Sequence, residues 1–503
     1  MEVDSANTEA QRKRFGLASY WWAVIGVVLG AFVVILNNSL INVGIPMLMQ
    51  IFHASEAQMT WVVTGYMITL GVIIPISGFV VDRWGTKRIY LIALLIFAAG
   101  AAGCTLATSV PMLILFRIVQ AFGGALIMPS SMTIIYRAVP FQLRGTALGL
   151  WGISAMVAPA IGPTLSGYLL EYTSWHWLFL INVPVALLAL GVGAWALRET
   201  PTQKEEHFDF AGFIASTIGM VTLLLAFNES KQLGWTSGPI VGFFIVAIVS
   251  FVFFVRHELR IDEPLLQLRV FASRTFSWAM IVVAVTVIGL FGGVFLIPLY
   301  TQGVLGFTPI ETGLLLLPAA AATAVLNPIA GRLFDQYGPR WVVVSGVLIV
   351  ACATLGMAFW EPSTSFSAML LWLLVRGIGL GMSNMTATSA ALNTVRPEWI
   401  PRASAINNVV RQVSGALGIA LLTSLYSGRI DQLKAQGFSM IDAASLSFNR
   451  AFLIVALLSF CTVPLAFLLR RTLPAGILEP SSNRSNDPSS ASSSSKPFSP
   501  GAR

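Results

Sequence analysis

Long apolar runs, separated by short polar gaps, recur along the whole chain. Six occupy residues 20–44, 58–81, 88–107, 111–133, 144–169 and 175–197, two follow at 208–227 and 239–255, and six more lie at 275–300, 312–333, 341–360, 366–392, 403–426 and 451–469. A helix needs about 20 mostly apolar residues to cross the hydrocarbon core of a bilayer. The pattern therefore predicts an all-α polytopic membrane protein with fourteen transmembrane helices.

The grouping of these runs predicts the domain organisation. We expect an N-terminal segment over residues 1–19, a six-helix bundle over 20–200, two extra helices with a linker over 201–272, and a second six-helix bundle over 273–472. The last residues are rich in Ser, Pro and Asn, and they bury too little apolar surface to repay the entropy of ordering. A disordered tail is therefore expected over 473–503.

Composition and charge agree with a membrane protein. The chain is 56% hydrophobic and 10% charged, against about 25% charged residues in soluble domains. Its net charge of +8 does not indicate nucleic-acid binding, because the Lys and Arg residues are spread over many gaps instead of clustering. Most lie in the alternate gaps that share a side with both termini. Cytoplasmic gaps collect Lys and Arg, so both termini are predicted to be cytoplasmic.

The chain shows no pattern that indicates an enzyme or a bound cofactor. Its three cysteines lie in separate apolar runs, which predicts neither a disulfide framework nor a metal site. We find no GxSxG, HExxH or P-loop sequence. We therefore expect no catalytic residues, no cofactor, no metal and no nucleic-acid partner, with the lipid bilayer as the surrounding solvent.

A polar motif occurs twice, in equivalent gaps of the two predicted bundles. Its residues are Gly78, Asp82, Arg83, Gly85, Lys87 and Arg88 in the first copy and Gly331, Asp335, Gly338 and Arg340 in the second. Duplicated bundles are typical of secondary transporters, which rock two halves about a central site. Glycine permits close helix approach and tight turns, and Asp accepts hydrogen bonds from helix N-termini and basic groups. We interpret the motif as a conformational latch between the halves; the alternative is a static loop with a solvated charge pair.

Residues 15–472 resemble the major facilitator superfamily, and within it the fourteen-span drug:proton antiporters. Beside the loop motif, the resemblance rests on Arg117, Gln120, Gly123 and Gly124 in the fourth run, on Gly152, Pro159, Gly162, Pro163 and Gly167 in the fifth, on Trp175 to Pro184 in the sixth, and on Arg411, Gln412, Gly415 and Gly418. It implies a gating role for the fifth helix. It also implies proton-driven export of hydrophobic or amphipathic small molecules across a bacterial-type inner membrane. It does not indicate whether a periplasmic adaptor is needed.

One departure from the family pattern concerns proton coupling. The family carries an Asp in its first span where this chain has Asn37, and an amide cannot titrate. No acidic residue lies deep in a predicted span. The remaining candidates for coupling or for a substrate pathway are Asn42, Arg117, Gln120, Arg376, Arg411 and Gln412.

Three arginines lie inside predicted spans, where a charge is costly and usually faces the bundle interior. Arg117 is near enough to the end of its span to extend to the surface instead, so both readings stay open. Arg376 and Arg411 lie deeper, which favours an interior role. They would pair with backbone carbonyls, with a distant Glu or with substrate. The alternative function is therefore export of an anionic compound that Arg376 or Arg411 binds.

Overall fold

The computed structural model describes residues 13–14, 17–54, 56–199, 208–261 and 263–469. Apart from an antiparallel pair of two-residue strands, β1 (Lys13–Arg14) and β2 (Leu17–Ala18), its regular elements are helices. The predicted tail over 473–503 and most of the predicted N-terminal segment over 1–19 lie outside the described residues.

The chain forms two helical halves and an extra pair of helices between them in sequence. The first half contains α2 (Ser19–Ile51), α3 (Glu56–Ile73), α4 (Ser77–Trp84), α5 (Thr86–Thr105), α6 (Val110–Ala138), α7 (Arg144–Tyr172), α8 (Trp177–Leu180) and α9 (Asn182–Ala196). The extra pair is α10 (Phe210–Leu233) and α11 (Gly238–Glu258). The second half contains α12 (Arg274–Gly303), α13 (Pro309–Tyr337), α14 (Pro339–Met357), α15 (Phe366–Leu392), α16 (Ile400–Ala435) and α17 (Met440–Phe467). Short 3₁₀ turns lie at η1 (Phe141–Leu143), η2 (Leu268–Ala272) and η3 (Pro397–Trp399).

Side-chain caps set the start of several helices. Thr308 and Glu311 form a capping box at the start of α13, in which each side chain satisfies a backbone N–H that the helix itself cannot. Ser365 accepts from the backbone N–H of Ala368 at the start of α15. Between such caps, the apolar residues favour burial in lipid. Every backbone polar group needs a partner there, and a helix supplies these partners within the segment.

The second predicted span, 58–81, is not one straight helix. It consists of α3 and α4, which meet at a bend of 56° after Ile73. Pro75 lies in the turn between them, and proline has no backbone N–H to continue the helical hydrogen bonds. The prediction that Asp82 and Asp335 lie in gaps between helices was also wrong, because α4 and α13 continue through these residues. Helices extend past their apolar part, so hydropathy alone places their ends too early.

The helices account for the predicted spans closely. Among the described residues, twelve helices are long and apolar enough to cross a membrane, and the bent pair α3–α4 makes a thirteenth candidate. The remaining predicted span, 144–169, corresponds to α7, which is not among these candidates. The multi-pass character is therefore shown, while the total of fourteen spans stays a prediction.

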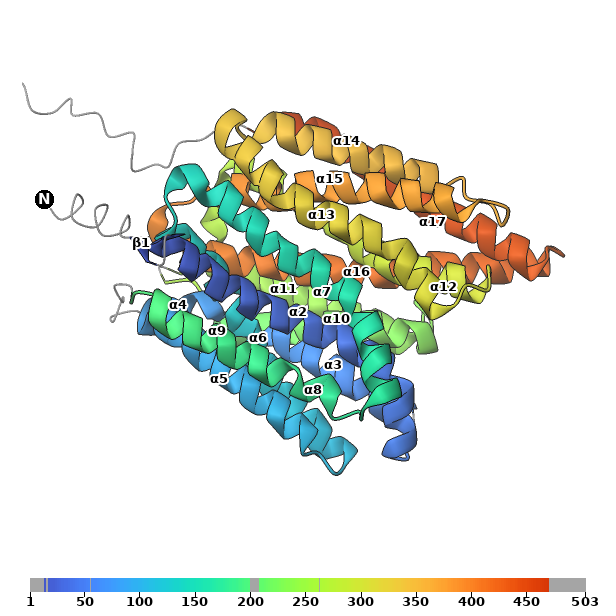
Figure 1. The fold of residues 1–503 in the computed structure, drawn as a ribbon, viewed down its shortest axis with the longest axis horizontal. Coiled ribbons are helices and arrows are strands. Elements are labelled where there is room, and N and C mark those ends of the chain that lie inside the picture. The colour runs from blue at the N-terminus through green and yellow to red at the C-terminus, as the bar shows by residue number, and fades with distance from the viewer. Residues whose placement is uncertain (1–12, 15–16, 55, 200–207, 262, 470–503) are drawn as a thin grey trace, which may run out of the picture.

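The two halves lie side by side near β1 and spread apart toward the opposite end (Figure 1). Contacts between them run from α7 to α13 and α15, and from α16 to α6 and α4. Of the extra pair, α10 packs against α3 of the first half and α16 of the second, and α11 packs against α10. Many apolar side chains of α11, such as Ile248 and Val249, are exposed, so α11 lies at the periphery.

Candidate functional site

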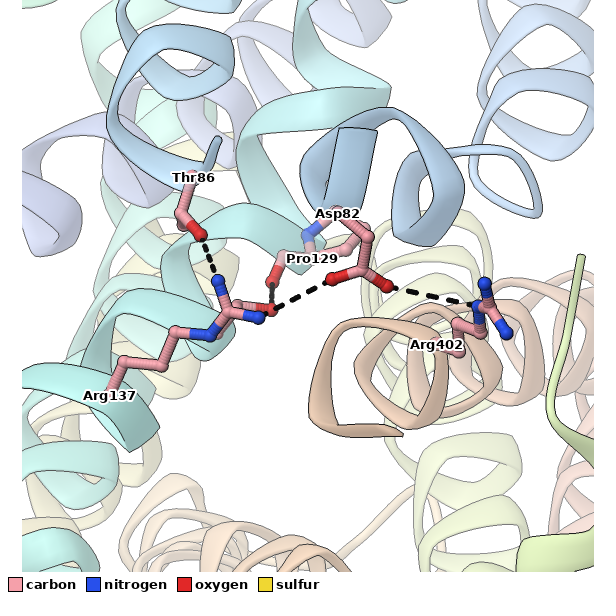
Figure 2. Close-up of polar contacts among 6 residues, drawn as sticks. Asp82, Thr86, Pro129, Arg137 and Arg402 are labelled. Atoms are coloured by element: carbon pink, nitrogen blue, oxygen red, sulfur yellow. Dashed lines mark hydrogen bonds and ion pairs between the residues drawn. The ribbon is translucent and has the colours of Figure 1, made fainter. Parts of the chain in front are cut away.

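The first copy of the repeated motif joins α4 to the start of α16. The side chain of Asp82 is 2% exposed and lies between two arginines (Figure 2). Arg137 on α6 donates through Nη2 to Oδ1 of Asp82 at 3.3 Å and through Nη1 to the hydroxyl of Thr86 at 2.7 Å. Arg402 on α16 places its Nε 3.8 Å from Oδ2 of Asp82. Asp82 therefore links its own half to the other half.

Two glycines allow this contact. A Cβ on Gly78 would lie 3.0 Å from the Cα of Arg402, so only glycine lets α4 approach α16 this closely. Gly85 adopts a φ of +91°, a left-handed conformation that L side chains disfavour, and it forms the whole connection between α4 and α5.

The second copy joins α13 to the start of α7 in a different way. Asp335 accepts hydrogen bonds from the backbone N–H groups of Gly145 and Thr146 and from the hydroxyl of Thr146, each at 3.0 Å. These N–H groups belong to the first turn of α7, where no carbonyl of the helix can accept from them and the helix dipole favours a negative charge. Asp335 therefore caps a helix of the other half.

Glycines again set the distance. A Cβ on Gly331 would lie 2.2 Å from the carbonyl oxygen of Gly145, so the backbones of α13 and α7 touch directly. Gly338, with a φ of +82°, forms the turn into α14 as Gly85 does into α5.

The two contacts are related by the internal repeat. Thr146 is the third residue of α7, and Arg402 is the third residue of α16. Each aspartate therefore lies near the end of its own helix and binds the third residue of a helix in the opposite half. We call these two contacts the latch, and the end of the molecule that holds them the latch end.

Further contacts join the halves beyond the latch. On α7, Gly149 lies against the backbone of Asn327, where a Cβ would be 2.3 Å from its carbonyl oxygen. Tyr136 on α6 donates to the carbonyl of Ser389 on α15 at 3.2 Å. The side-chain amide of Asn407 on α16 lies 3.4 Å from the sulfur of Met132 on α6.

The hydrophobic cores differ between the two ends. One cluster of buried residues includes Trp151 and Ile135 from the first half with Phe334, Met385 and Ile406 from the second. At the opposite ends of the helices, the described residues form two separate clusters, one within each half. The halves therefore share a core at the latch end and are packed independently at the other.

A buried polar network lies inside the first half. Arg117 has no exposed surface; its Nη1 donates to Oε1 of Gln120 at 2.9 Å and its Nε to the carbonyl of Val62 at 3.3 Å. Gln120 donates in turn to Oδ1 of Asn37 at 3.1 Å, as Asn182 does at 3.4 Å. The guanidinium carbon of Arg117 also lies 4.0 Å from the ring centre of Tyr66.

This network decides between the two readings of Arg117. The side chain points into the bundle and does not extend to the surface, so that alternative was wrong. The reason is local, because a carbonyl of α3, an aromatic face and an amide all lie within reach of the guanidinium. Asn37 lies between Gln120 and Asn182 in the network.

Arg376 and Arg411 occupy different environments in the second half. Arg376 is 5% exposed and donates to the carbonyl of Gly289 on α12 at 2.6 Å, inside its own bundle. Arg411 is partly exposed and donates to Oδ1 of Asn384 on α15 at 2.5 Å. Arg411 lies one helical turn from Asn407, on the face of α16 that meets α6. Gln412, beside it, is also partly exposed.

Residues predicted for the gating helix lie along α7. A Cβ on Gly152 would lie 2.8 Å from Nδ2 of Asn327 in the other half, and one on Gly162 would lie 2.2 Å from the hydroxyl of Ser39. Gly167 has nothing within 4 Å of the position of a Cβ. The side chains of Pro159, Pro163 and Asn42 lie outside the described set, although α7 and α2 run through their positions.

The partners of both aspartates were not predicted from the sequence. Arg137 and Arg402 were counted only as charges that set the orientation, and Gly145 and Thr146 were not singled out. Of the predicted basic members of the motif, Arg88 and Arg340 are exposed. Gly145 and Arg402 each lie one residue from the start of the fifth apolar run of their predicted bundle, which marks a helix end but does not identify a partner.

Several known proteins are similar to this chain in sequence or in fold. The chain is 32% identical over 404 residues to the lincomycin resistance protein LmrB of Listeria monocytogenes serovar 1/2a, covering 80% of this chain and 86% of that protein. It is also 32% identical over 383 residues to a multidrug resistance protein B homolog of Mycobacterium tuberculosis, covering 74% of this chain and 70% of that protein. The fold is similar to that of the human organic anion transporter MFSD10 (TETRAN), with a TM-score of 0.62 at 14% identity over 89% of this chain and 99% of that one.

The family itself is shown by a match over most of the chain. The model of the Major Facilitator Superfamily matches residues 27–419, which include both copies of the latch motif and the start of α16. This match agrees with the two latch contacts between the halves, with the core that the halves share at one end, and with the many membrane-spanning helices. The chain is therefore a multi-pass membrane transporter of the Major Facilitator Superfamily.

Proposed function

We propose that this transporter exports hydrophobic or amphipathic small molecules in exchange for protons, as one of the fourteen-span drug:proton antiporters. It would do so in the inner membrane of a bacterial-type cell, with both termini and the latch end in the cytoplasm. The main support for the proposal is the pair of latch contacts at one end, which join Asp82 to Arg402 and Asp335 to Thr146. Two relatives named for lincomycin and multidrug resistance support the export of drug-like molecules.

The cycle follows from the difference between the two ends. In the described conformation the latch end is closed, because the halves share a core and both aspartates have partners across the interface. At the opposite end the halves are packed independently. Alternating access requires the reverse arrangement as a second state, in which the latch contacts are broken and the other ends approach. Each of the two latch contacts can then form in only one of the two states.

The substrate would bind between the halves, beyond the latch. Arg411 and Gln412 lie there as partly exposed polar groups on α16, and Asn327 lies on α13 against Gly152. Within the described part of the chain, Asn327 makes no hydrogen bond through either polar side-chain atom, although it is 1% exposed. A buried amide without a partner is costly and is a suitable group for a bound molecule to satisfy.

A second candidate function rests on Arg411. It is a partly exposed cation on the face of α16 that meets α6, and it donates a hydrogen bond to the neutral side chain of Asn384. An anionic substrate could therefore bind it. Arg376 fits this role less well, because it bonds to Gly289 within its own bundle. Under this reading Arg411→Ala abolishes transport of an anion, whereas unchanged kinetics would assign Arg411 a structural role.

The test is substrate movement in proteoliposomes under an imposed pH gradient, with a fluorescent amphipathic cation and an anionic dye measured in parallel. Gradient-dependent movement of the cation is expected, and collapse of the gradient by a protonophore should stop it. Liposomes without protein supply the background leak. Movement that is independent of the gradient, or movement of the anion alone, would contradict proton-driven drug export and favour the second candidate.

A further inference from the structure

A group of three titratable side chains, two of them buried, lies where the extra helices meet the latch end. Asp209 directly precedes α10, and His257 and Glu258 are the last two residues of α11. Nε2 of His257 lies 2.8 Å from Oδ1 of Asp209, and the backbone N–H of Gly212 donates to the same oxygen at 2.9 Å. We call Asp209, His257 and Glu258 the acid cluster.

Among the residues that the structure describes, each carboxylate of the acid cluster has one oxygen without a hydrogen-bond partner. The side chain of Asp209 is 3% exposed and Glu258 is 1% exposed. Oε2 of Glu258 accepts from the backbone N–H of Leu266 at 3.2 Å, while Oε1 of Glu258 and Oδ2 of Asp209 accept no hydrogen bond. A Cβ on Gly212 would lie 2.1 Å from Oδ2 of Asp209 and 2.9 Å from Oε1 of Glu258. The two unpartnered oxygens therefore face one small region.

This arrangement fits a proton as its ligand. Burying an ionised carboxylate without a partner is unfavourable, and two ionised carboxylates facing one another inside a protein also repel. One proton held between Oδ2 of Asp209 and Oε1 of Glu258 would remove one negative charge and give both oxygens a hydrogen bond, as in other carboxylate pairs that share a proton. Among the described residues, no group of three or more His, Cys, Asp or Glu is placed to hold a metal ion.

The acid cluster is linked to the latch through Arg402. Arg402 on α16 is near enough for its positive charge to favour the ionised form of Glu258, as Asp209 is near enough to disfavour it. Arg402 is also the residue that pairs with Asp82 across the halves, and His257 faces Asp209 from α11. In addition, α10 packs against both α3 and α16, so it contacts each half. The charge of the cluster therefore acts on the residue that closes one side of the latch.

We propose that Asp209 and Glu258 form a proton-binding site that senses the pH at the latch end and favours the closed latch when it is protonated. With the proton bound, Arg402 is left to pair with Asp82. When the proton leaves, the cluster competes with Asp82 for Arg402, and opening of the latch end brings water to a carboxylate that is otherwise buried. The proposal adds regulation to the proposed export cycle, and it rests on the latch being the gate of that cycle.

The test measures the latch itself, without substrate or gradient. Spin labels replace the exposed residues Gln142 and Tyr337, which lie at the latch end of the two halves, in a chain whose native cysteines are changed to serine. Pulsed electron–electron distances then give the ratio of closed to open molecules in lipid nanodiscs from about pH 5 to about pH 9. One linked proton changes that ratio by up to about tenfold per pH unit, with the closed form favoured by acid.

Variants identify the group that binds the proton. Glu258→Gln and Asp209→Asn should stay closed and lose the pH response, whereas the exposed Glu171→Gln should respond like the parent chain. His257→Gln should retain a response. An unchanged ratio in the parent chain across this pH range would overturn the proposal, as would a full response in both Glu258→Gln and Asp209→Asn. Because no transport is measured, these outcomes stay separate from the proteoliposome result.

Discussion

Asp335 on α13 accepts hydrogen bonds from both the backbone N–H and the hydroxyl of Thr146 on α7, each at 3.0 Å. A carboxylate of one half therefore caps a helix of the other half. The cap exists only while the latch end is closed, so its free energy counts entirely toward the difference between the two states.

Replacing Asp335 with Asn should weaken the closed state. The amide removes the negative charge at the N-terminus of α7 and loses hydrogen bonds of a kind that contribute about 1.5 to 3 kcal/mol when one partner is charged. The ratio of closed to open molecules, measured with the labels at positions 142 and 337, should fall about tenfold or more. Thr146→Val removes only the hydroxyl and should have a smaller effect. Equal populations in Asp335→Asn and the parent chain would show that the cap does not hold the latch.

Replacing Gly145 with Ala should prevent closure by a steric mechanism. The new Cβ would lie 2.7 Å from the carbonyl oxygen of Gly331 and 2.6 Å from Oδ1 of Asp335, which is closer than real Cβ atoms come. We expect loss of transport with normal insertion into the membrane, and a shift of the label distance toward the open state. Gly167→Ala is the matched control on the same helix, because its Cβ would meet nothing within 4 Å. Equal activity of the two variants would rule out the close approach as a requirement.

Replacing Asp82 with Asn should impair transport while the protein stays in the membrane. Asp82 is buried between Arg137 and Arg402, and its loss leaves two arginine side chains beside an uncharged amide. Breaking a buried ion pair by removing one partner costs about 3 to 5 kcal/mol. The measurement is initial export rate per molecule of inserted protein, with the exposed Asp431→Asn as control. Full activity of Asp82→Asn would remove the mechanical role of this contact.

Replacing Asn37 with Asp should introduce proton dependence into the first-half network. Oδ1 of Asn37 already accepts from Gln120 and Asn182, so a carboxylate keeps these partners, and Arg117 supplies a positive charge one residue away in the network. The variant should fold, and the number of protons moved per substrate should rise. Simultaneous measurement of proton and substrate flux in proteoliposomes tests this, with Asn37→Ala as the non-titrating control. An unchanged ratio of fluxes would show that the first span takes no part in coupling.

The aspartates of the latch were predictable from sequence, but their partners were not. Both motif copies stand out because four residues recur in the same order in equivalent gaps. The partners of Asp82 and Asp335 lie far away in the chain and become neighbours only when the halves pack. A basic residue at a helix end, such as Arg402, has the same local pattern whether it orients the protein in the membrane or binds an aspartate.

Helix ends and breaks were predicted only in part for a related reason. Pro75 separates α3 from α4, whereas Pro129 and Pro298 lie inside continuous helices. In a membrane, packing against neighbouring helices can compensate for the backbone hydrogen bond that proline removes, so the outcome depends on contacts the local sequence does not contain. The direction of Arg117 was undecided because spans that are apolar on every side give no sign of which face is buried.

The latch contacts are chemically unequal, and this asymmetry gives the two edges of the closed end different sensitivity to ionic strength. Added salt weakens an ion pair more than a hydrogen bond with a neutral donor, and the contact across the edge between α4 and α16 is the ion pair of Arg402 with Asp82 at 3.8 Å. The hydrogen bonds from Gly145 and Thr146 to Asp335 have neutral donors and depend much less on salt. We therefore expect concentrated salt to loosen the edge between α4 and α16 before the edge between α13 and α7. Distances measured across each edge in rising salt would lengthen together if the latch opened as one unit.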